Sequence, residues 1–189
     1  MRRLVLIPIV HSQEDMGSLG RKLRIDRIAK LRAQLHWNAV RRRIQRLQLN
    51  WAEVKVYQDG LPDTNPSIIE KILAEIHSPN YDVLRWLVAQ GATLLGTEAP
   101  HLLQEEYRYL QAVFNAPDDA TRQRARRVYS ERADPLLAER DAYIARRIAE
   151  TLPPDGIGLL FVGQAHYVAR FFPSDVEVQT LQNVGSPPA

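Results

Sequence analysis

Two short aliphatic runs, one near each end of the chain, constrain the fold most. Residues 3–10 form a run of aliphatic and β-branched residues that includes Pro8, and residues 157–163 are the most strand-like run in the chain. Apolar residues on both faces are typical of strands in the middle of a parallel sheet, where helices cover both sides. The two runs therefore predict a buried central sheet.

The segments between the two runs alternate between strand and helix patterns. Further strands are expected at residues 54–57, 92–96 and 176–181, and helices from about Gly20 to Trp51, from Asn65 to His77, and over residues 81–90, 100–115 and 117–151. This order predicts an α/β fold with a mostly parallel or mixed sheet of about four to five strands and helices on both faces. The final pair of strands could add an antiparallel edge. We expect one domain over residues 1–182 and a flexible tail over 183–189.

Composition excludes several classes of protein. The chain has no cysteine, so disulfides, thiolate metal ligands and a cysteine nucleophile are ruled out. No segment approaches the roughly 20 apolar residues of a membrane span. The first apolar run is short and leads into polar residues rather than into a cleavage site for a secretory signal. We therefore expect a cytoplasmic protein that does not bind membranes.

The first helix is rich in arginine, which raises the question of nucleic acid. Its apolar positions form one stripe (Ile28, Leu31, Leu35, Val40, Ile44 and Leu47), and basic side chains crowd the other side. A solvated helix face explains this pattern more simply than nucleic-acid contact, because aromatic residues are sparse and the formal net charge is only +3. Neither GxGxxG nor GxSxG occurs in the chain.

Polar and ionisable residues follow the predicted strands at the points where the strands end. His11, Glu14 and Asp15 follow the first strand, Asp59 the second, Glu98 the third and His166 the fourth. Ligands of parallel α/β proteins bind at the carboxyl ends of the strands, so these side chains should share one edge of the sheet. Imidazoles with carboxylates suit a divalent metal, for which His11, His166 and Glu14 are the expected ligands. They equally suit acid/base chemistry without a metal.

Each of these residues also has a structural interpretation. Either histidine could be a buried side chain held by hydrogen bonds, and Glu14, Asp15 or Glu98 could favour the start of the following helix by their negative charge. His101 could also cap a helix. His11 and His166 remain the best candidates, because both follow apolar runs closely.

The last third of the chain resembles a known family. Glu139-Arg140-Asp141 precedes a helical segment, a Pro/Gly loop and the strand Leu159-Leu160-Phe161-Val162-Gly163-Gln164-Ala165-His166. This order resembles the TraB/GumN/Tiki group of the erythromycin-esterase-like and ChaN-like superfamily, in which an arginine opens the helix and a glycine-x-x-histidine motif ends the strand. A first such motif would be Pro8-Ile9-Val10-His11, with proline in place of glycine. The family's acidic position would fall at Asp59, and Asp141 replaces the usual asparagine.

The resemblance implies an α/β sheet with a metal-dependent or His/carboxylate hydrolytic site. The expected function is therefore a peptidase-like or esterase-like hydrolase with a small-molecule or peptide substrate, and a divalent ion of the manganese, zinc or cobalt class could be its cofactor. His11 and His166 would act as ligands or acid/base groups, with Asp59, Glu98 or Glu14 supplying a carboxylate. Arg140 would stabilise negative charge on the substrate. The alternative is a non-catalytic module that binds an anionic ligand or a partner in the same cleft. A homo-oligomer is also possible, because the 117–151 helix is very polar.

Overall fold

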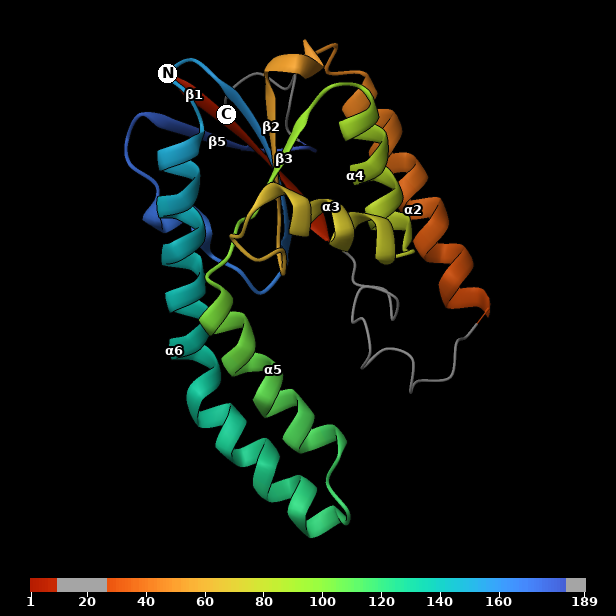
Figure 1. The fold of residues 1–189 in the computed structure, drawn as a ribbon, viewed down its shortest axis with the longest axis vertical. Coiled ribbons are helices and arrows are strands. Elements are labelled where there is room, and N and C mark those ends of the chain that lie inside the picture. The colour runs from red at the N-terminus through yellow and green to blue at the C-terminus, as the bar shows by residue number, and fades with distance from the viewer. Residues whose placement is uncertain (10–26, 183–189) are drawn as a thin grey trace.

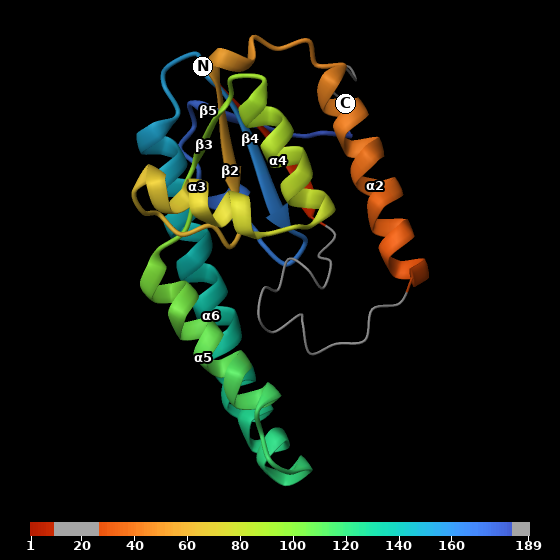
Figure 2. The ribbon, with the colours of Figure 1, turned by 45° about the vertical axis from the view of Figure 1, so that its right-hand side comes forward.

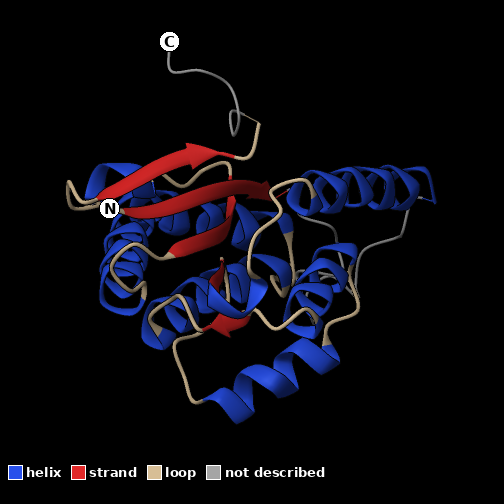
Figure 3. Cartoon of the chain, turned by 90° about the horizontal axis from the view of Figure 1, so that it is seen from above, coloured by secondary structure: helices blue, strands red, loops and turns tan. Residues whose placement is uncertain are grey.

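The sheet is built from five parallel strands. In a computed structural model, which describes residues 1–9 and 27–182, the strands are β1 (Arg2–Ile9), β2 (Val54–Gln58), β3 (Thr93–Leu95), β4 (Ile157–Gly163) and β5 (Val176–Thr180), in the order β3-β2-β4-β1-β5. The two apolar runs, β1 and β4, pair with each other in the sheet interior. Seen from above, the strand direction rotates across the sheet (Figure 3), which is the usual twist.

The helices occupy nearly the predicted segments. They are α2 (Arg27–Gln45), α3 (Pro66–Glu75), α4 (Pro79–Ala89), α5 (Pro100–Phe114) and α6 (Asp119–Thr151), with short 3₁₀ helices η2 (Trp51–Glu53) and η3 (Val168–Phe171). Three of them begin at a polar cap: the side chains of Asn65, Ser78 and Asp118 accept backbone N–H bonds from Ser67, Tyr81 and Thr121. Such caps satisfy donors that the first helical turn leaves unpaired.

Helices cover both faces of the sheet, as the apolar strands require (Figure 1). On one face, Trp37 and Ile44 of α2 and Leu84 of α4 pack against β1, β2 and β4. On the other face, Ile144 and Ile148 of α6 pack against the same three strands. The predicted α/β fold is therefore confirmed, with two apolar layers around the central strands.

The α5–α6 pair forms a hairpin that extends well beyond the sheet (Figures 1 and 2). The carboxyl-terminal half of α6 lies on the sheet, whereas its amino-terminal half packs only along α5 in both views. Leu102 of α5 and Leu136 of α6 are buried together where the hairpin leaves the sheet. The hairpin therefore has its root at the carboxyl edge of the strands.

Two details of the first helix were predicted wrongly. Helix α2 ends at Gln45 rather than near Trp51, and Gln48 has a left-handed φ of 50°. Leu47, Leu49 and Trp51 instead pack against the core from the segment after the helix, and this packing outweighs their helical spacing. The predicted apolar stripe is also wrong in its first half, because Leu31 is 60% exposed and Leu35 59%. The buried side of α2 is formed by Ala33, Trp37, Val40 and Ile44.

The last strand does not form an antiparallel edge. β5 pairs with β1 in parallel, from Arg2 beside Val176 to Leu6 beside Thr180. A parallel neighbour requires the chain to cross back to the amino edge of the sheet, and the segment containing η3 makes this crossing with Val168 buried against α6.

The remaining expectations concern membrane-spanning helices and the residues near the two ends of the chain. Among residues 1–9 and 27–182, no helix combines the length and apolar character needed to cross a membrane. The predicted tail, residues 183–189, lies outside the described residues, as do His11, Glu14 and Asp15 and the start of the expected first helix.

Candidate functional site

Four of the predicted site residues meet at the carboxyl edge of the sheet. Asp59 follows β2, Glu98 follows β3, His166 follows β4, and Arg140 reaches them from α6. Asp59, Glu98 and Arg140 are no more than 8% exposed, and the side chain of His166 is 5% exposed. His11 and Glu14, the other predicted members, lie outside the described residues. His101 is exposed on α5 and is not part of this cluster.

Arg140 is the centre of the site. Its Nε lies 2.5 Å from Glu98 Oε2, and its Nη2 lies 2.8 Å from Glu98 Oε1 and 3.0 Å from Asp59 Oδ1. Its Nη1 donates to Glu106 Oε2 at 2.6 Å. The planar guanidinium can bind several carboxylates at once because its donors are held in a fixed fork. Arg140 thereby joins α6 to the ends of β2 and β3 and to α5.

The backbone around Glu98 fixes this carboxylate beside Arg140. Gly60, in the left-handed region with φ of 78°, donates its N–H to Glu98 Oε1 at 2.6 Å. The loops after β2 and β3 are joined by the Asp63 N–H to Glu98 O bond of 2.7 Å. Gly96 permits this close approach, because a Cβ there would lie 2.2 Å from Pro62 O. Glu98 is therefore held by backbone on one side and by a guanidinium on the other.

His166 lies between two carboxylates. Its Nδ1 is 2.5 Å from Asp141 Oδ1, and its Nε2 is 3.3 Å from Asp59 Oδ2. Asp141 also accepts the Tyr167 N–H at 2.8 Å, and Asp59 accepts the Gly163 N–H at 3.0 Å. Both carboxylates are thus fixed by the end of β4 and the loop after it, and both ring nitrogens of His166 are engaged.

The two buried carboxyl groups nearest Arg140 differ in their affinity for protons. Burial raises the pKa of Glu98 to about 7, and the neighbouring Asp59 charge adds to this rise, although Arg140 opposes it. Burial also acts to raise the pKa of Asp59, but the hydrogen bond and charge of His166, with help from Glu98 and Arg140, hold this pKa well below its usual range. Asp59 is therefore ionised at neutral pH, whereas Glu98 can gain or lose a proton there.

The imidazole of His166 is arranged to be a cation. Burial lowers its pKa, but hydrogen bonds to Asp141 and Asp59 outweigh burial and raise the pKa to about 10. A metal ligand must instead offer a neutral ring nitrogen with a free lone pair. In this arrangement both ring nitrogens of His166 are engaged by carboxylates, and the other predicted ligands, His11 and Glu14, lie outside the described residues, so the metal site stays a prediction. Within the described ranges no group of three or more His, Asp or Glu side chains could hold a metal ion.

The charges of the site argue against an anionic ligand. Arg140 and His166 provide two cations, and they face the carboxyl groups of Asp59, Asp141, Glu98 and Glu106. Both ring nitrogens of His166 and all three guanidinium nitrogens of Arg140 already have a carboxylate partner. An added anion would have to displace one of these carboxylates from a buried cation, which is costly.

Sequence reasoning missed two members of the site, Asp141 and Glu106. Asp141 replaces the asparagine of the resembled family, and this departure was itself the signal of a different environment for His166. Glu106 lies within α5, four residues after Leu102, where the core contact of the helix begins. The hydroxyl of Tyr129, which is on α6, donates a hydrogen bond of 3.0 Å to Glu106 Oε1. Only the packing of the hairpin brings Glu106 to Arg140, so no strand-end pattern could reveal it.

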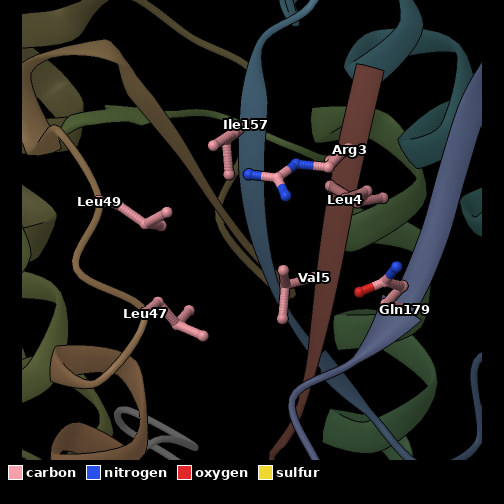
Figure 4. A pocket seen from close by; sticks show the side chains of 7 residues that line it. All are labelled: Arg3, Leu4, Val5, Leu47, Leu49, Ile157 and Gln179. Atoms are coloured by element: carbon pink, nitrogen blue, oxygen red, sulfur yellow. The ribbon is translucent and has the colours of Figure 1, made fainter. Parts of the chain in front are cut away.

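A small cavity lies at the other end of β1 and β4. It has a volume of about 80 Å³ and is lined by Arg3, Leu4, Val5, Leu47, Leu49, Ile157 and Gln179 (Figure 4). Ligand sites for small organic molecules are usually about 300–1,000 Å³. This cavity is therefore too small for such a ligand, and the chemistry of the described residues is concentrated at the carboxyl edge.

The fold and site define a class: a parallel α/β protein with a buried arginine, carboxylate and histidine cluster at the carboxyl edge of its sheet. In comparisons with known proteins, the chain matches no protein-family model, no curated protein and no solved structure. The similarity to the TraB/GumN/Tiki group accordingly stays a prediction from the motifs.

Proposed function

We propose that the protein is a hydrolase that cleaves an ester or amide bond and that Glu98 is the group that transfers protons. The observation that carries this proposal is a pair of buried carboxyl groups, Asp59 and Glu98, both bound by Arg140. Their surroundings push their pKa values in opposite directions. Such a difference is the pattern that acid/base sites use to work at neutral pH, and a pKa near 7 is the most effective for proton transfer.

The proposed reaction needs one group, Glu98, that first accepts a proton and then donates it. Glu98 is 0% exposed, so the proposal requires that a water molecule reach its carboxylate when the substrate binds. Ionised Glu98 then takes a proton from that water molecule while the water oxygen forms a bond to the carbonyl carbon of the substrate. The resulting carboxylic acid then gives that proton to the leaving oxygen or nitrogen as its bond to the carbon breaks. Glu98 ends in its starting state, and the products are an acid and an alcohol or amine.

The other residues of the site are positioning residues in this proposal. Arg140 and the Gly60 N–H hold the Glu98 carboxyl in place. Burial keeps the pKa of Glu98 high and the negative charge of Asp59 adds to this effect, while His166 and Gly163 hold Asp59. No step of the proposed reaction is routed through a metal. A cytoplasmic location remains part of the proposal.

Hydrolysis of p-nitrophenyl butyrate and of a matching p-nitroanilide tests the proposal. Glu98→Gln keeps the size of the side chain but cannot transfer a proton, so we expect kcat/KM to fall by about 100-fold or more. The wild-type kcat/KM should rise with pH through about 7, because the ionised form of Glu98 is the active one.

Glu105→Gln is the matched control. Glu105 is on the same helix as Glu106 but binds Arg132 instead of Arg140, so its loss should leave kcat/KM unchanged. Equal rates for wild type and Glu98→Gln, in variants that unfold at the same temperature, would exclude Glu98 as the proton carrier.

A further inference from the structure

An open apolar groove runs alongside the site. It has a volume of about 550 Å³, within the usual range for small-molecule sites. Its apolar walls come from the loop after β2, the start of α3 and the first three turns of α5, with contributions from Pro62, Ile68, Pro100, Leu103, Tyr107 and Leu110. Ile68 is 42% exposed and Tyr107 is 40% exposed. Large apolar side chains that remain this exposed along one groove are typical of a binding surface.

The groove is continuous with the proposed catalytic cluster. Gly60 and Glu106 belong to the lining. The Gly60 N–H is bound to Glu98 Oε1, and Glu106 Oε2 is bound to Arg140 Nη1. Gly60 also follows Asp59 directly in the chain. A molecule that lies in the groove therefore has one end beside the segment that holds Asp59 and Glu98.

The charge of the lining selects the chemistry of the occupant. Among residues 1–9 and 27–182, Glu106 is the only charged side chain that lines the groove, and it is already bound by Arg140 and Tyr129. The lining that the described part of the chain provides contains no lysine, arginine or histidine that could pair with an anionic group. Thr64 and Gln104 offer neutral hydrogen-bonding groups. Fatty-acid carboxylates and phosphates are thus disfavoured, and an uncharged molecule with an apolar chain is favoured.

We infer that this groove binds the apolar acyl chain of an uncharged small-molecule substrate, with the polar end of the molecule at Gly60 and Glu106. The inference rests on the proposed function only for the bond at that polar end. Binding of the chain itself depends on burial of apolar surface in the groove. The substrate class would then be neutral esters or amides of aliphatic acids.

Binding of uncharged alcohols isolates the groove from catalysis. We would measure dissociation constants of n-butanol, n-hexanol and n-octanol by calorimetry, with octanoate as the anionic counterpart of n-octanol. Each buried CH₂ should lower the dissociation constant by up to about fourfold. Octanoate should bind at least about tenfold more weakly than n-octanol, because its charge has no cationic partner in the groove. Affinities that are independent of chain length would overturn the inference.

Ile68→Glu places a charge in the groove, and Val88→Glu is its matched control. Val88 is on α4, is 38% exposed and does not line the groove. Ile68→Glu should weaken n-octanol binding at least about tenfold, whereas Val88→Glu should not change it. The same loss in both variants would contradict the inference. So would a wild-type dimer, seen by sedimentation, that Ile68→Glu dissociates, because a second copy of the chain would then occupy the groove.

A series of p-nitrophenyl esters separates this inference from the proposed function. Alcohol binding that strengthens with chain length, without any ester hydrolysis, would support the groove and contradict the hydrolase. Hydrolysis that requires Glu98 but has the same kcat/KM for acetate, butyrate and octanoate esters would support the hydrolase and contradict the groove. If both are correct, kcat/KM rises with acyl length, and Ile68→Glu removes that rise.

Discussion

Arg140 illustrates how a single residue can organise the site and constrain its chemistry. It is 6% exposed, and its three nitrogens contact three carboxylates from separate parts of the chain. A buried guanidinium without partners would be strongly destabilising, because the charge loses its hydration. Glu98 is one of the carboxylates that compensate this cost, and burial leaves it with a pKa of about 7.

Asp141→Asn tests how the charge of His166 is maintained. Asparagine keeps an oxygen near His166 Nδ1 but removes the negative charge beside it. We expect the pKa of His166 to fall from about 10 by about 1–3 pH units, because a nearby opposite charge has about that effect. NMR titration of the His166 ring measures this value.

Asp134→Asn is the control for this substitution, since Asp134 is exposed on the same helix. Its effect on the His166 titration should be nil. If the two variants titrate alike, Asp141 does not maintain the charge on His166. The free energy of unfolding should also fall by about 1–3 kcal/mol in Asp141→Asn alone, because a buried hydrogen-bonded charge is lost.

The strand-end residues could be predicted from sequence, but their partners could not. Asp59, Glu98 and His166 each follow a recognisable strand, so the sheet rule alone brings them to one edge. Arg140 was predicted as a site residue from the family resemblance, and it lies in the middle of α6 instead of at the start of a helix. Asp141 and Glu106 are set by helix packing, which a strand-end pattern does not encode. The pairing that makes His166 a cation was therefore hidden as well.

At the scale of elements, the errors occurred where packing competes with periodicity. The segment after Gln45 keeps helical spacing, but Leu47 and Leu49 contact the core from a non-helical backbone. The direction of β5 could not be predicted, because the segment between Gly163 and Val176 is long enough for either a turn or a crossing. The polar pattern of α6 was correctly assigned to a helix, yet nothing in it indicated that half of the helix would extend beyond the sheet.

The α5–α6 hairpin should differ in stability along its length. Near the sheet, Leu102 and Leu136 are buried and Arg132 binds both Glu105 and Glu139. Further out, Phe114 is 38% exposed and Val128 is 50% exposed. Elements with few buried contacts open at low free-energy cost. Hydrogen exchange followed by mass spectrometry should therefore show amides of 110–128 exchanging at least about tenfold faster than those of 140–150. Uniform protection along α6 would contradict this expectation.

At the scale of the whole molecule, one architectural choice explains the position of the site. All five strands are parallel, so every carboxyl end lies at the same edge. Two of the crossings that leave this edge for the amino edge, through α5–α6 and through η3, use the face that α6 covers. Arg140 is therefore beside the ends of β2, β3 and β4 at once. The groove lies where α5 leaves this edge, so the proposed binding and the proposed chemistry share one part of the fold.

The buried charges also predict how the stability of the molecule depends on pH. The pKa of His166 is raised from 6.5 to about 10 by folding, so its contribution is fully present below pH 6.5 and is lost as the pH rises to about 10. The pKa of Glu98, raised from 4.5 to about 7, gives a loss of the same sign between those two values. Asp59 acts oppositely: its lowered pKa stabilises the fold above pH 3.8 and ceases to do so in acid.

His166→Gln isolates the alkaline part of this dependence. Between about pH 6 and about pH 10, the wild-type free energy of unfolding should fall by on the order of 4 kcal/mol more than that of the variant, because the variant has no imidazolium to deprotonate. Urea unfolding at a series of pH values measures both curves, and common losses from tyrosines and lysines cancel in their difference. His101→Gln, at an exposed position on α5, should follow the wild type throughout. Should all three curves run parallel, His166 does not carry a proton that folding binds, and the ion pair between its ring and Asp59 would have to be assigned as a neutral hydrogen bond.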